Sequence, residues 1–320
     1  MIVSDNLKPP LMRDVVIDRI FEEARTDKNI LFISADFGAA ALDRYRMELP
    51  DQFIHAGISE QNMVDLSSGL ALSGKKVFLY AMAPFLTARC YEQIKCVIAS
   101  MNLPITLIAV GVGLGYDHAT LTHFTPEDIA CMRALNDIEV LTPADAEAAK
   151  EMTNIAIKNP DFRYMRLDRQ GLAPVYNGQF KSLYRQGFGH IVKGRSVVIV
   201  TCGMLLQKAL LACEDLIGQG IDAGVIDLFQ IKPINGQELA KVLAGYKAVV
   251  TVEEQSLEGG MGSALLEAMV DYSVCKPVKR LGMRDGYAVV NGDRNDLHEL
   301  YNIDTSHMIN AVLELMEFSG

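Results

Sequence analysis

The chain has 320 residues, half of them hydrophobic, with 30 lysines and arginines against 40 aspartates and glutamates. The net charge of −10 disfavours a surface for nucleic acid or anionic membrane, because such surfaces cluster positive charge. The sequence contains no run of 18 apolar residues, the pattern that would predict a membrane span. The first residues lack the basic and apolar regions of a signal peptide. Six scattered cysteines without metal-ligand spacing are typical of reduced thiols, so we expect a cytoplasmic protein without zinc or disulfides.

The first part of the chain alternates helical and strand patterns, which indicates a parallel sheet with right-handed crossovers. An amphipathic helix is expected over 11–25, and continuous apolar runs predict buried parallel strands. The expected strands are 30–33, 76–80, 105–110, 139–142 and 163–167, with helices over 87–101, 126–135 and 144–157. We assign residues 1–175 to this first domain.

Residues 171–188 are richer in turn formers, and we interpret 176–189 as a linker. A second α/β block follows, which we assign to a domain over 190–320. Its expected strands are 196–201, 223–227 and 248–253, with helices over 205–217, 239–243 and 263–272 and a closing helix over 298–317. The predicted fold class is therefore α/β, with two three-layer α/β/α domains.

Residues 53–72 form the most informative stretch. A short apolar strand leads into Gly57, Ser59 can cap a helix, and Glu60 lies in its first turn. The apolar residues Met63, Val64, Leu66, Leu70 and Ala71 recur at helical spacing and predict one buried face. A carboxyl where a strand ends and a helix begins occupies the usual ligand crevice of an open α/β sheet, and it suits proton exchange with a basic ring nitrogen. From position alone, ordinary first-turn helix chemistry is the alternative for Glu60.

The segment Gly57-Ile58-Ser59-Glu60-Gln61-Asn62-Met63, followed by Gly69-Leu70-Ala71-Leu72-Ser73-Gly74, resembles the G-I-x-E-x-x-M…G-L-A-L-x-G signature of the transketolase family. The resemblance extends from about Arg13 to the end of the chain. It implies a thiamine diphosphate pyrimidine-binding domain followed by a transketolase C-terminal-like domain. It also implies that Glu60 is the catalytic glutamate that bonds N1′ of the cofactor's aminopyrimidine ring.

Further cofactor contacts follow from the same resemblance. Phe85 and Tyr91 match the aromatic residues that cradle the aminopyrimidine ring, although Ala88 stands where a second aromatic residue usually lies. Ile58 and Asp36 match positions near the cofactor. Without the resemblance, ordinary core packing would be the better interpretation of both aromatic residues.

A glycine-rich loop follows the strand over 105–110. It lacks the third glycine of a dinucleotide fingerprint, because Tyr116 stands there, so we expect the glycines to let the loop pack closely against a cofactor or a partner instead. The next residues, Asp117 to His123, resemble the family's G-x-D-G-P-T-H loop with about two extra residues. Asp117 is then expected to bind substrate, and His123 or His118 to steady the developing oxyanion, with His123 preferred because Thr122 precedes it.

Recognition of a substrate phosphate departs from the family pattern. Arg13 and Arg169 match the two phosphate-binding arginines, but the serine position is Ala40 and the histidine has no counterpart. Each missing charged hydrogen bond weakens binding by about 1.5–3 kcal/mol. The substrate is therefore expected to be phosphorylated differently or not at all.

The chain lacks the Gly-Asp-Gly…Asn motif with which this family holds diphosphate and Mg²⁺. We therefore predict a C-terminal subunit of a split transketolase, with no metal ligands of its own. It would pair with a separate N-terminal transketolase-like subunit that binds diphosphate and Mg²⁺, in an α2β2 heterotetramer with a homodimer contact of this chain. Two alternatives stay open: a subunit like 1-deoxyxylulose-phosphate synthase or the 2-oxo acid dehydrogenase E1 β chain, and a catalytically silent interaction subunit.

Overall fold

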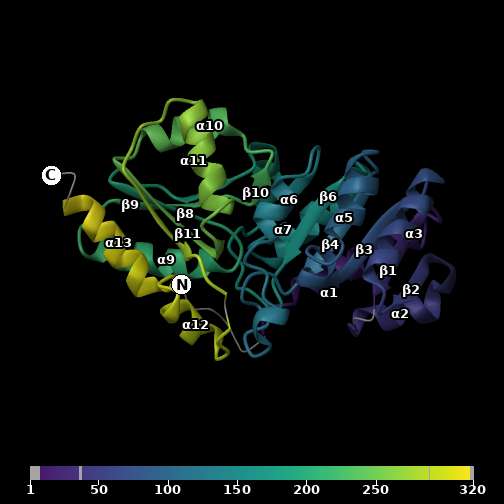
Figure 1. Ribbon diagram of the computed structural model, residues 1–320. Coiled ribbons are helices and arrows are strands. Elements are labelled where there is room, and N and C mark those ends of the chain that lie inside the picture. Colours follow the sequence, from purple (N-terminus) through teal and green to yellow (C-terminus); the bar gives the residue numbers. More distant parts are fainter. Residues whose placement is uncertain (1–7, 36–37, 288, 318–320) are drawn as a thin grey trace.

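The computed structural model describes residues 8–35, 38–287 and 289–317. It contains a seven-stranded sheet, in the right half of Figure 1, and a five-stranded sheet in the left half, each covered by helices on both faces. The two α/β/α units confirm the predicted fold class.

The seven-stranded sheet has the order β10-β5-β6-β4-β3-β1-β2. Its strands are β1 (Ile30–Ala35), β2 (Phe53–Gly57), β3 (Lys76–Met82), β4 (Ile105–Val110), β5 (Glu139–Leu141), β6 (Arg163–Leu167) and β10 (Gln230–Lys232). All neighbours pair in parallel except β10, which is antiparallel to β5. The strand order reverses between β1 and β3, so this sheet has a topological switch point where a ligand crevice is expected.

Helices cover both faces of this sheet. On one face lie α1 (Met12–Ala24), α2 (Ala41–Glu48), α7 (Ala146–Lys158) and α8 (Phe180–Leu183), whose apolar residues share a core with Phe32 and Tyr80 of the sheet. On the other lie α3 (Glu60–Leu72), α4 (Ala83–Leu86), α5 (Tyr91–Gln93), the π-helical segment Ile94–Ala99 and α6 (Asp128–Arg133). The single helix predicted over 87–101 is therefore wrong, because two short helices and a π-helical segment span 83–99.

The five-stranded sheet has the order β12-β11-β8-β9-β7, with only β7 antiparallel to its neighbour. Its strands are β7 (Gly189–Val192), β8 (Val197–Thr201), β9 (Ala223–Asp227), β11 (Ala248–Ser256) and β12 (Val278–Met283). The helices are α9 (Leu205–Gly218), α10 (Gly236–Ala244), α11 (Met261–Asp271), α12 (Arg294–Leu300) and α13 (Thr305–Glu317). The expected closing helix is split in two around Asn302, whose φ of 57° interrupts a helix.

The two sheets are joined by more than a linker. One apolar core contains Ile129 and Met132 of α6, which covers the first sheet. The same core includes Ile226 of β9 and Met261 of α11 in the second domain. Strand β10 leaves the second block and pairs with β5 of the first sheet, which a division into two separate sequence segments does not anticipate. Within the described ranges, no helix is both long and apolar enough to cross a membrane.

A buried acid also ties the linker to the second sheet. Asp227, at the end of β9, is fully buried and accepts a hydrogen bond from the hydroxyl of Tyr176. Burial raises the pKa of Asp227 to about 8; the Tyr176 hydrogen bond opposes this rise and the charge of Asp145 adds to it. The folded protein therefore holds a proton on Asp227 at pH values where the unfolded chain, with a carboxyl pKa near ~3.9, has released it.

This difference predicts a pH-dependent loss of stability. Because the folded state binds the extra proton, the contribution of Asp227 to the unfolding free energy falls as the pH rises from about 4 to about 8. We expect Asp227→Asn to remove this part of the decline, measured by urea denaturation between pH 5 and 8. The exposed Asp222→Asn variant is the control, and identical pH profiles for Asp227→Asn and the wild type would contradict the prediction.

Candidate active site

Glu60 is placed by a tight turn between β2 and α3. Gly57 ends the strand with a φ of +73°, a left-handed conformation that glycine adopts without strain. Ser59 precedes the helix, but its hydroxyl donates to the Ala56 carbonyl at 2.5 Å instead of capping the helix as predicted. Met63 anchors the buried face of α3, whereas Leu66, predicted on that face, is 39% exposed. The turn leaves Glu60 buried at the end of the sheet that holds the switch point.

An arginine contacts both Glu60 and Phe85, one of the two aromatic residues predicted to surround the cofactor ring. Arg89 donates from one of its terminal nitrogens to Glu60 Oε2 at 2.7 Å. Its guanidinium carbon lies over the Phe85 ring, 4.1 Å from the ring centroid. Glu60 follows β2 and Phe85 follows β3, so two predicted residues from separate strand ends lie within reach of a single side chain.

Ring contacts continue from Phe85 toward the predicted substrate residues. The His123 imidazole meets Phe85 edge-on with 5.3 Å between ring centroids, and it lies 5.6 Å from the ring of Tyr116. The guanidinium of Arg169 is in turn 5.0 Å from the Tyr116 centroid. A contact path therefore runs from Glu60 to Arg169 through residues that follow β2, β3, β4 and β6.

The two loop histidines differ in placement. The side chain of His118 is 72% exposed, and its Nε2 lies 4.0 Å from Asp117. His123 is partly buried, and its Nδ1 lies 2.9 Å from the Thr122 hydroxyl, which fixes the orientation of the ring. Asp117 is mostly buried and accepts a hydrogen bond from the backbone N–H of His118. Of the two candidates, only His123 has a ring contact with Phe85 among the described residues.

The remaining predicted residues lie at varied distances from this path. Tyr91 is partly buried at the start of α5, but Ile58 is 79% exposed and turns away from the core. Asp36 lies outside the described residues. Arg13 pairs with Asp14 at 3.2 Å, and its charge opposes the rise in the pKa values that burial causes in Tyr80 and Tyr116. The charge of Arg169, whose guanidinium lies over the Tyr116 ring, likewise opposes the rise that burial causes in the pKa of Tyr116.

The glycines of the loop after β4 pack against protein groups. Gly111 has a φ of +78°, and a Cβ there would lie 1.9 Å from the Tyr116 ring. Gly113 has a φ of +60°, and a Cβ there would lie 2.6 Å from Glu254 Oε2. Both glycines therefore allow close packing against this chain's own groups, Tyr116 and Glu254 of the second domain, and not against the cofactor or partner that the sequence led us to expect.

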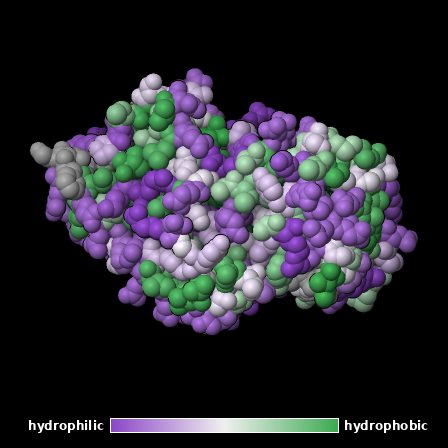
Figure 2. All heavy atoms as spheres, viewed as in Figure 1, coloured by the Kyte–Doolittle hydropathy of each residue, from purple (hydrophilic) through white to green (hydrophobic). Residues whose placement is uncertain are grey.

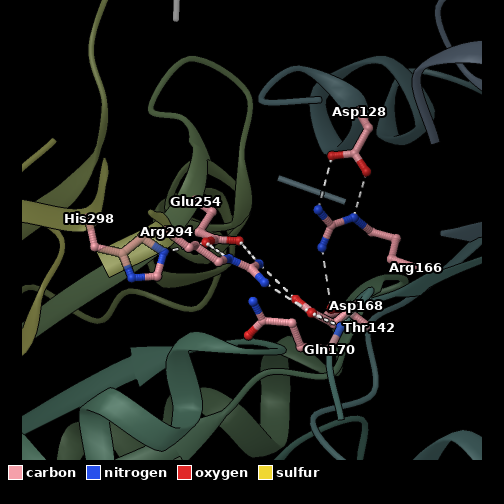
Figure 3. Close-up of polar contacts among 8 residues, drawn as sticks. All are labelled: Asp128, Thr142, Arg166, Asp168, Gln170, Glu254, Arg294 and His298. Atoms are coloured by element: carbon pink, nitrogen blue, oxygen red, sulfur yellow. Dashed lines mark hydrogen bonds and ion pairs between the residues drawn. The ribbon is translucent and has the colours of Figure 1, made fainter. Parts of the chain in front are cut away.

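A network of buried charges holds the loop after β6, as Figure 3 shows. The Arg294 guanidinium donates to both carboxylate oxygens of Asp168, at 3.0 and 2.7 Å, and to Glu254 at 2.8 and 2.6 Å. His298 contacts the same Glu254. The positive charge of Arg294 holds the pKa of Glu254 well below its usual range despite burial. Asp168 immediately precedes Arg169. Arg294, the first residue of α12 in the second domain, therefore holds the loop that carries Arg169.

A second buried ion pair lies beside this network. Arg166 forms a bidentate contact with Asp128, at 2.7 and 3.1 Å, and also donates to Thr142 at 3.3 Å. Tyr164 donates to the same Asp128 at 2.7 Å. All four groups are buried, so this cluster joins β6 to the start of α6.

This geometry defines a class of protein: an open α/β sheet whose switch point carries a buried carboxyl beside an aromatic ring. Two family models match the chain, the transketolase pyrimidine-binding domain over residues 8–174 and the transketolase C-terminal domain over 189–308. The chain belongs to the transketolase family.

Some relatives that match this chain over nearly their own whole length are named as transketolase subunits. One subunit of an apulose-4-phosphate transketolase from Phocaeicola vulgatus is 31% identical, covering 94% of this chain and 96% of that protein. A 6-deoxy-6-sulfo-D-fructose transketolase subunit from a Clostridium species is 29% identical, covering 96% and 94%. The structure of a split-gene transketolase in an inactive β4 tetramer matches with a TM-score of 0.86 at 28% identity, covering 97% and 99%.

The residues present fit the aminopyrimidine half of thiamine diphosphate, the cofactor implied by the family. A ring nitrogen needs a carboxyl partner and the ring needs an aromatic surface; the single Arg89 guanidinium already meets both groups, Glu60 and Phe85. Across the described residues, no group of three or more histidine, cysteine, aspartate and glutamate side chains is arranged to hold a metal ion.

Sequence reasoning missed Arg89, Tyr116 and the Arg294 network. One signal was available for the network: two arginines lie within β6, a strand buried along its length, and an aspartate and a third arginine follow it directly. Charged residues in such a strand need partners. Which distant residues supply them is not readable from the sequence.

The network predicts a large stability effect for Arg294. Replacement by Met leaves the carboxylates of Asp168 and Glu254 buried without their cation, so we expect a loss of about 3–5 kcal/mol in the free energy of unfolding. Urea denaturation at pH 7 measures it. The exposed Arg284→Met variant should change stability by no more than about 0.5 kcal/mol, and equal effects of the two variants would contradict the prediction.

Proposed function

We propose that this chain is the C-terminal subunit of a thiamine diphosphate-dependent transketolase that transfers a two-carbon ketol unit from a ketose to an aldehyde. The observation that carries the proposal is that the buried carboxyl of Glu60 and the ring of Phe85, which follow separate strands of the first sheet, both contact the Arg89 guanidinium. Family membership and the subunit nature of the relatives support it.

Three residues of this chain would hold the cofactor's aminopyrimidine ring. When bound, thiamine diphosphate supplies a nucleophilic carbon that adds to the ketose carbonyl. Glu60 exchanges a proton with N1′ of the ring, a role that suits an ionisable group at a buried strand end. Phe85 and Tyr91 form the ring's apolar surroundings, and stacking contributes about 0.5–1.5 kcal/mol beyond burial.

His123 serves the substrate in this proposal. Its Nδ1 lies beside the Thr122 hydroxyl, so Nε2, on the opposite side of the ring, donates to the substrate oxygen that gains negative charge. Asp117 accepts a hydrogen bond from a sugar hydroxyl. His118 is exposed and is the second candidate for this substrate contact.

Arg13 and Arg169 bind an anionic group at the far end of the substrate. The names of two relatives specify a phosphorylated sugar, apulose 4-phosphate, and a sulfonated one, 6-deoxy-6-sulfo-D-fructose. Both sugars end in an oxyanion, which guanidinium groups bind in bidentate fashion. The exposed guanidinium of Arg169, which lies 5.0 Å from the Tyr116 ring centroid, supports such a subsite in this chain.

A separate subunit completes the enzyme by holding the diphosphate and Mg²⁺, most simply in a cytoplasmic α2β2 assembly. Apolar side chains on the end of the molecule that carries β2 and α3, at the right of Figure 2, support a contact with another chain. Ile58 is 79%, Leu66 39% and Leu72 60% exposed there, and such exposed apolar groups mark association surfaces.

The catalytic role of Glu60 predicts that Glu60→Gln lowers turnover of the assembled enzyme by about two to four orders of magnitude, because the amide cannot exchange the proton. Ketol transfer from a ketose to an aldehyde, assayed with the diphosphate-binding subunit present, measures it. The control is Asp65→Asn, an exposed acid on the same helix.

Other results would redirect the assignment. Wild-type activity of Glu60→Gln would end the catalytic role, and turnover by this chain alone would remove the need for a partner. Use of pyruvate in place of a ketose donor would favour the synthase-like or dehydrogenase-like alternative. Any Glu60-dependent turnover would exclude a silent interaction subunit.

The proposed anion subsite predicts a selective effect of Arg169→Met. Loss of a charged hydrogen bond weakens binding by about 1.5–3 kcal/mol, so we expect KM for a terminally phosphorylated or sulfonated ketose to rise roughly 10- to 100-fold. KM for a neutral ketose of the same length should change little. Arg185→Met, at another exposed arginine, should leave both values unchanged, and parallel changes for the two ketoses with Arg169→Met would count against the subsite.

A further inference from the structure

Arg89 makes two contacts with the residues that the proposed function reserves for the cofactor. It donates to Glu60 Oε2 at 2.7 Å, and its guanidinium carbon lies 4.1 Å from the centroid of Phe85. A guanidinium is planar, carries N–H donors at its edge and stacks on aromatic faces. An aminopyrimidine ring that bonds a carboxyl through a ring nitrogen and packs on an aromatic residue needs the same two partners.

The layering of these side chains shows which one covers the other. The side chain of Glu60 is 7% exposed, whereas that of Arg89 is 42% exposed. The guanidinium therefore forms the outer layer over the carboxyl. A ligand that approaches Glu60 from solvent meets Arg89 first.

The surroundings of Arg89 allow its side chain to leave. Ala88, beside it, is exposed and small, and it stands where the family usually places a second aromatic residue. Among the described residues, the structure gives the Arg89 side chain no hydrogen bond or ion pair other than the one to Glu60. A half-exposed arginine with one ion pair has a long, flexible stem and water as an alternative partner.

We propose that Arg89 is the resting occupant of the aminopyrimidine subsite and that it must move away from Glu60 before the cofactor ring can bind. This inference rests on the proposed function and adds a residue that sets the affinity of the site. Because only the fraction of molecules with an open site can bind, the closed arrangement raises the apparent dissociation constant by the inverse of that fraction.

The test uses the full-length chain and the probe 4-amino-5-hydroxymethyl-2-methylpyrimidine, the aminopyrimidine half of the cofactor, which needs no diphosphate grip. Dissociation constants come from NMR titration. Arg89→Met keeps a long unbranched side chain without charge or N–H donors, and we expect it to bind the probe roughly three- to tenfold more tightly than the wild type. Lys95→Met, which removes a nearby exposed cation, controls for charge alone and should leave affinity unchanged.

Two further measurements identify the cause. The side-chain N–H signals of Arg89 in the wild type should shift when the probe is added. Arg89→Met combined with Glu60→Gln should lose the gain in affinity, because the gain depends on access to the carboxyl. Arg89→Gln is a second variant that should also tighten binding, and circular dichroism checks that each variant is folded.

The possible failures are distinguishable. Weaker or unchanged binding by folded Arg89→Met and Arg89→Gln would overturn the inference and make Arg89 a supporting or neutral residue, while a Glu60-dependent affinity in the wild type would leave the proposed function intact. Binding that is absent or indifferent to Glu60→Gln in every variant would overturn the proposed cofactor site and the inference together.

Discussion

Parallel pairing of the strands is the constraint on which the candidate site depends. Neighbouring parallel strands end at the same edge of a sheet, so residues that follow different strands are gathered there however far apart they lie in the chain. Glu60 follows β2, Phe85 follows β3, His123 lies in the loop after β4, and Arg169 follows β6. Reversal of the strand order between β1 and β3 opens that edge to a ligand. The chemistry of the site therefore follows from topology before any single contact is considered.

Buried ion pairs hold the loop after β6 against the second domain. Arg294 is enclosed by Asp168 and Glu254, and none of the three is more than 6% exposed. Such an ion pair contributes little net stability compared with apolar packing, but removing one member is costly. Its effect here is positional, because it connects the second domain to the residue that precedes Arg169. The second domain is thus joined to the loop that carries Arg169, although it contributes no residue to the contact path itself.

The same physical property, planarity combined with N–H donors, explains two arginines with different fates. Arg169 stacks on Tyr116 at the far end of the contact path, where its charge is available to an anion. Arg89 stacks on Phe85 and is also bound to Glu60, so its charge is already paired with a carboxylate. The local partner, more than residue type, decides whether a guanidinium recognises a ligand or occupies a ligand's place.

The sequence by itself determined the fold class, most core strands of both sheets and the position of Glu60 at a strand end, because continuous apolar runs and helical spacing are local signals. Through motif resemblance it also suggested Phe85, His123 and Arg169 as candidate site residues. Only the tertiary structure decided that Arg89 binds Glu60, that His123 and not His118 meets Phe85, and that β10 crosses into the first sheet. These outcomes depend on which distant groups satisfy a buried charge, a ring face or an unpaired strand edge. Partners of that kind are selected by the packing of the whole chain, and no local pattern records them.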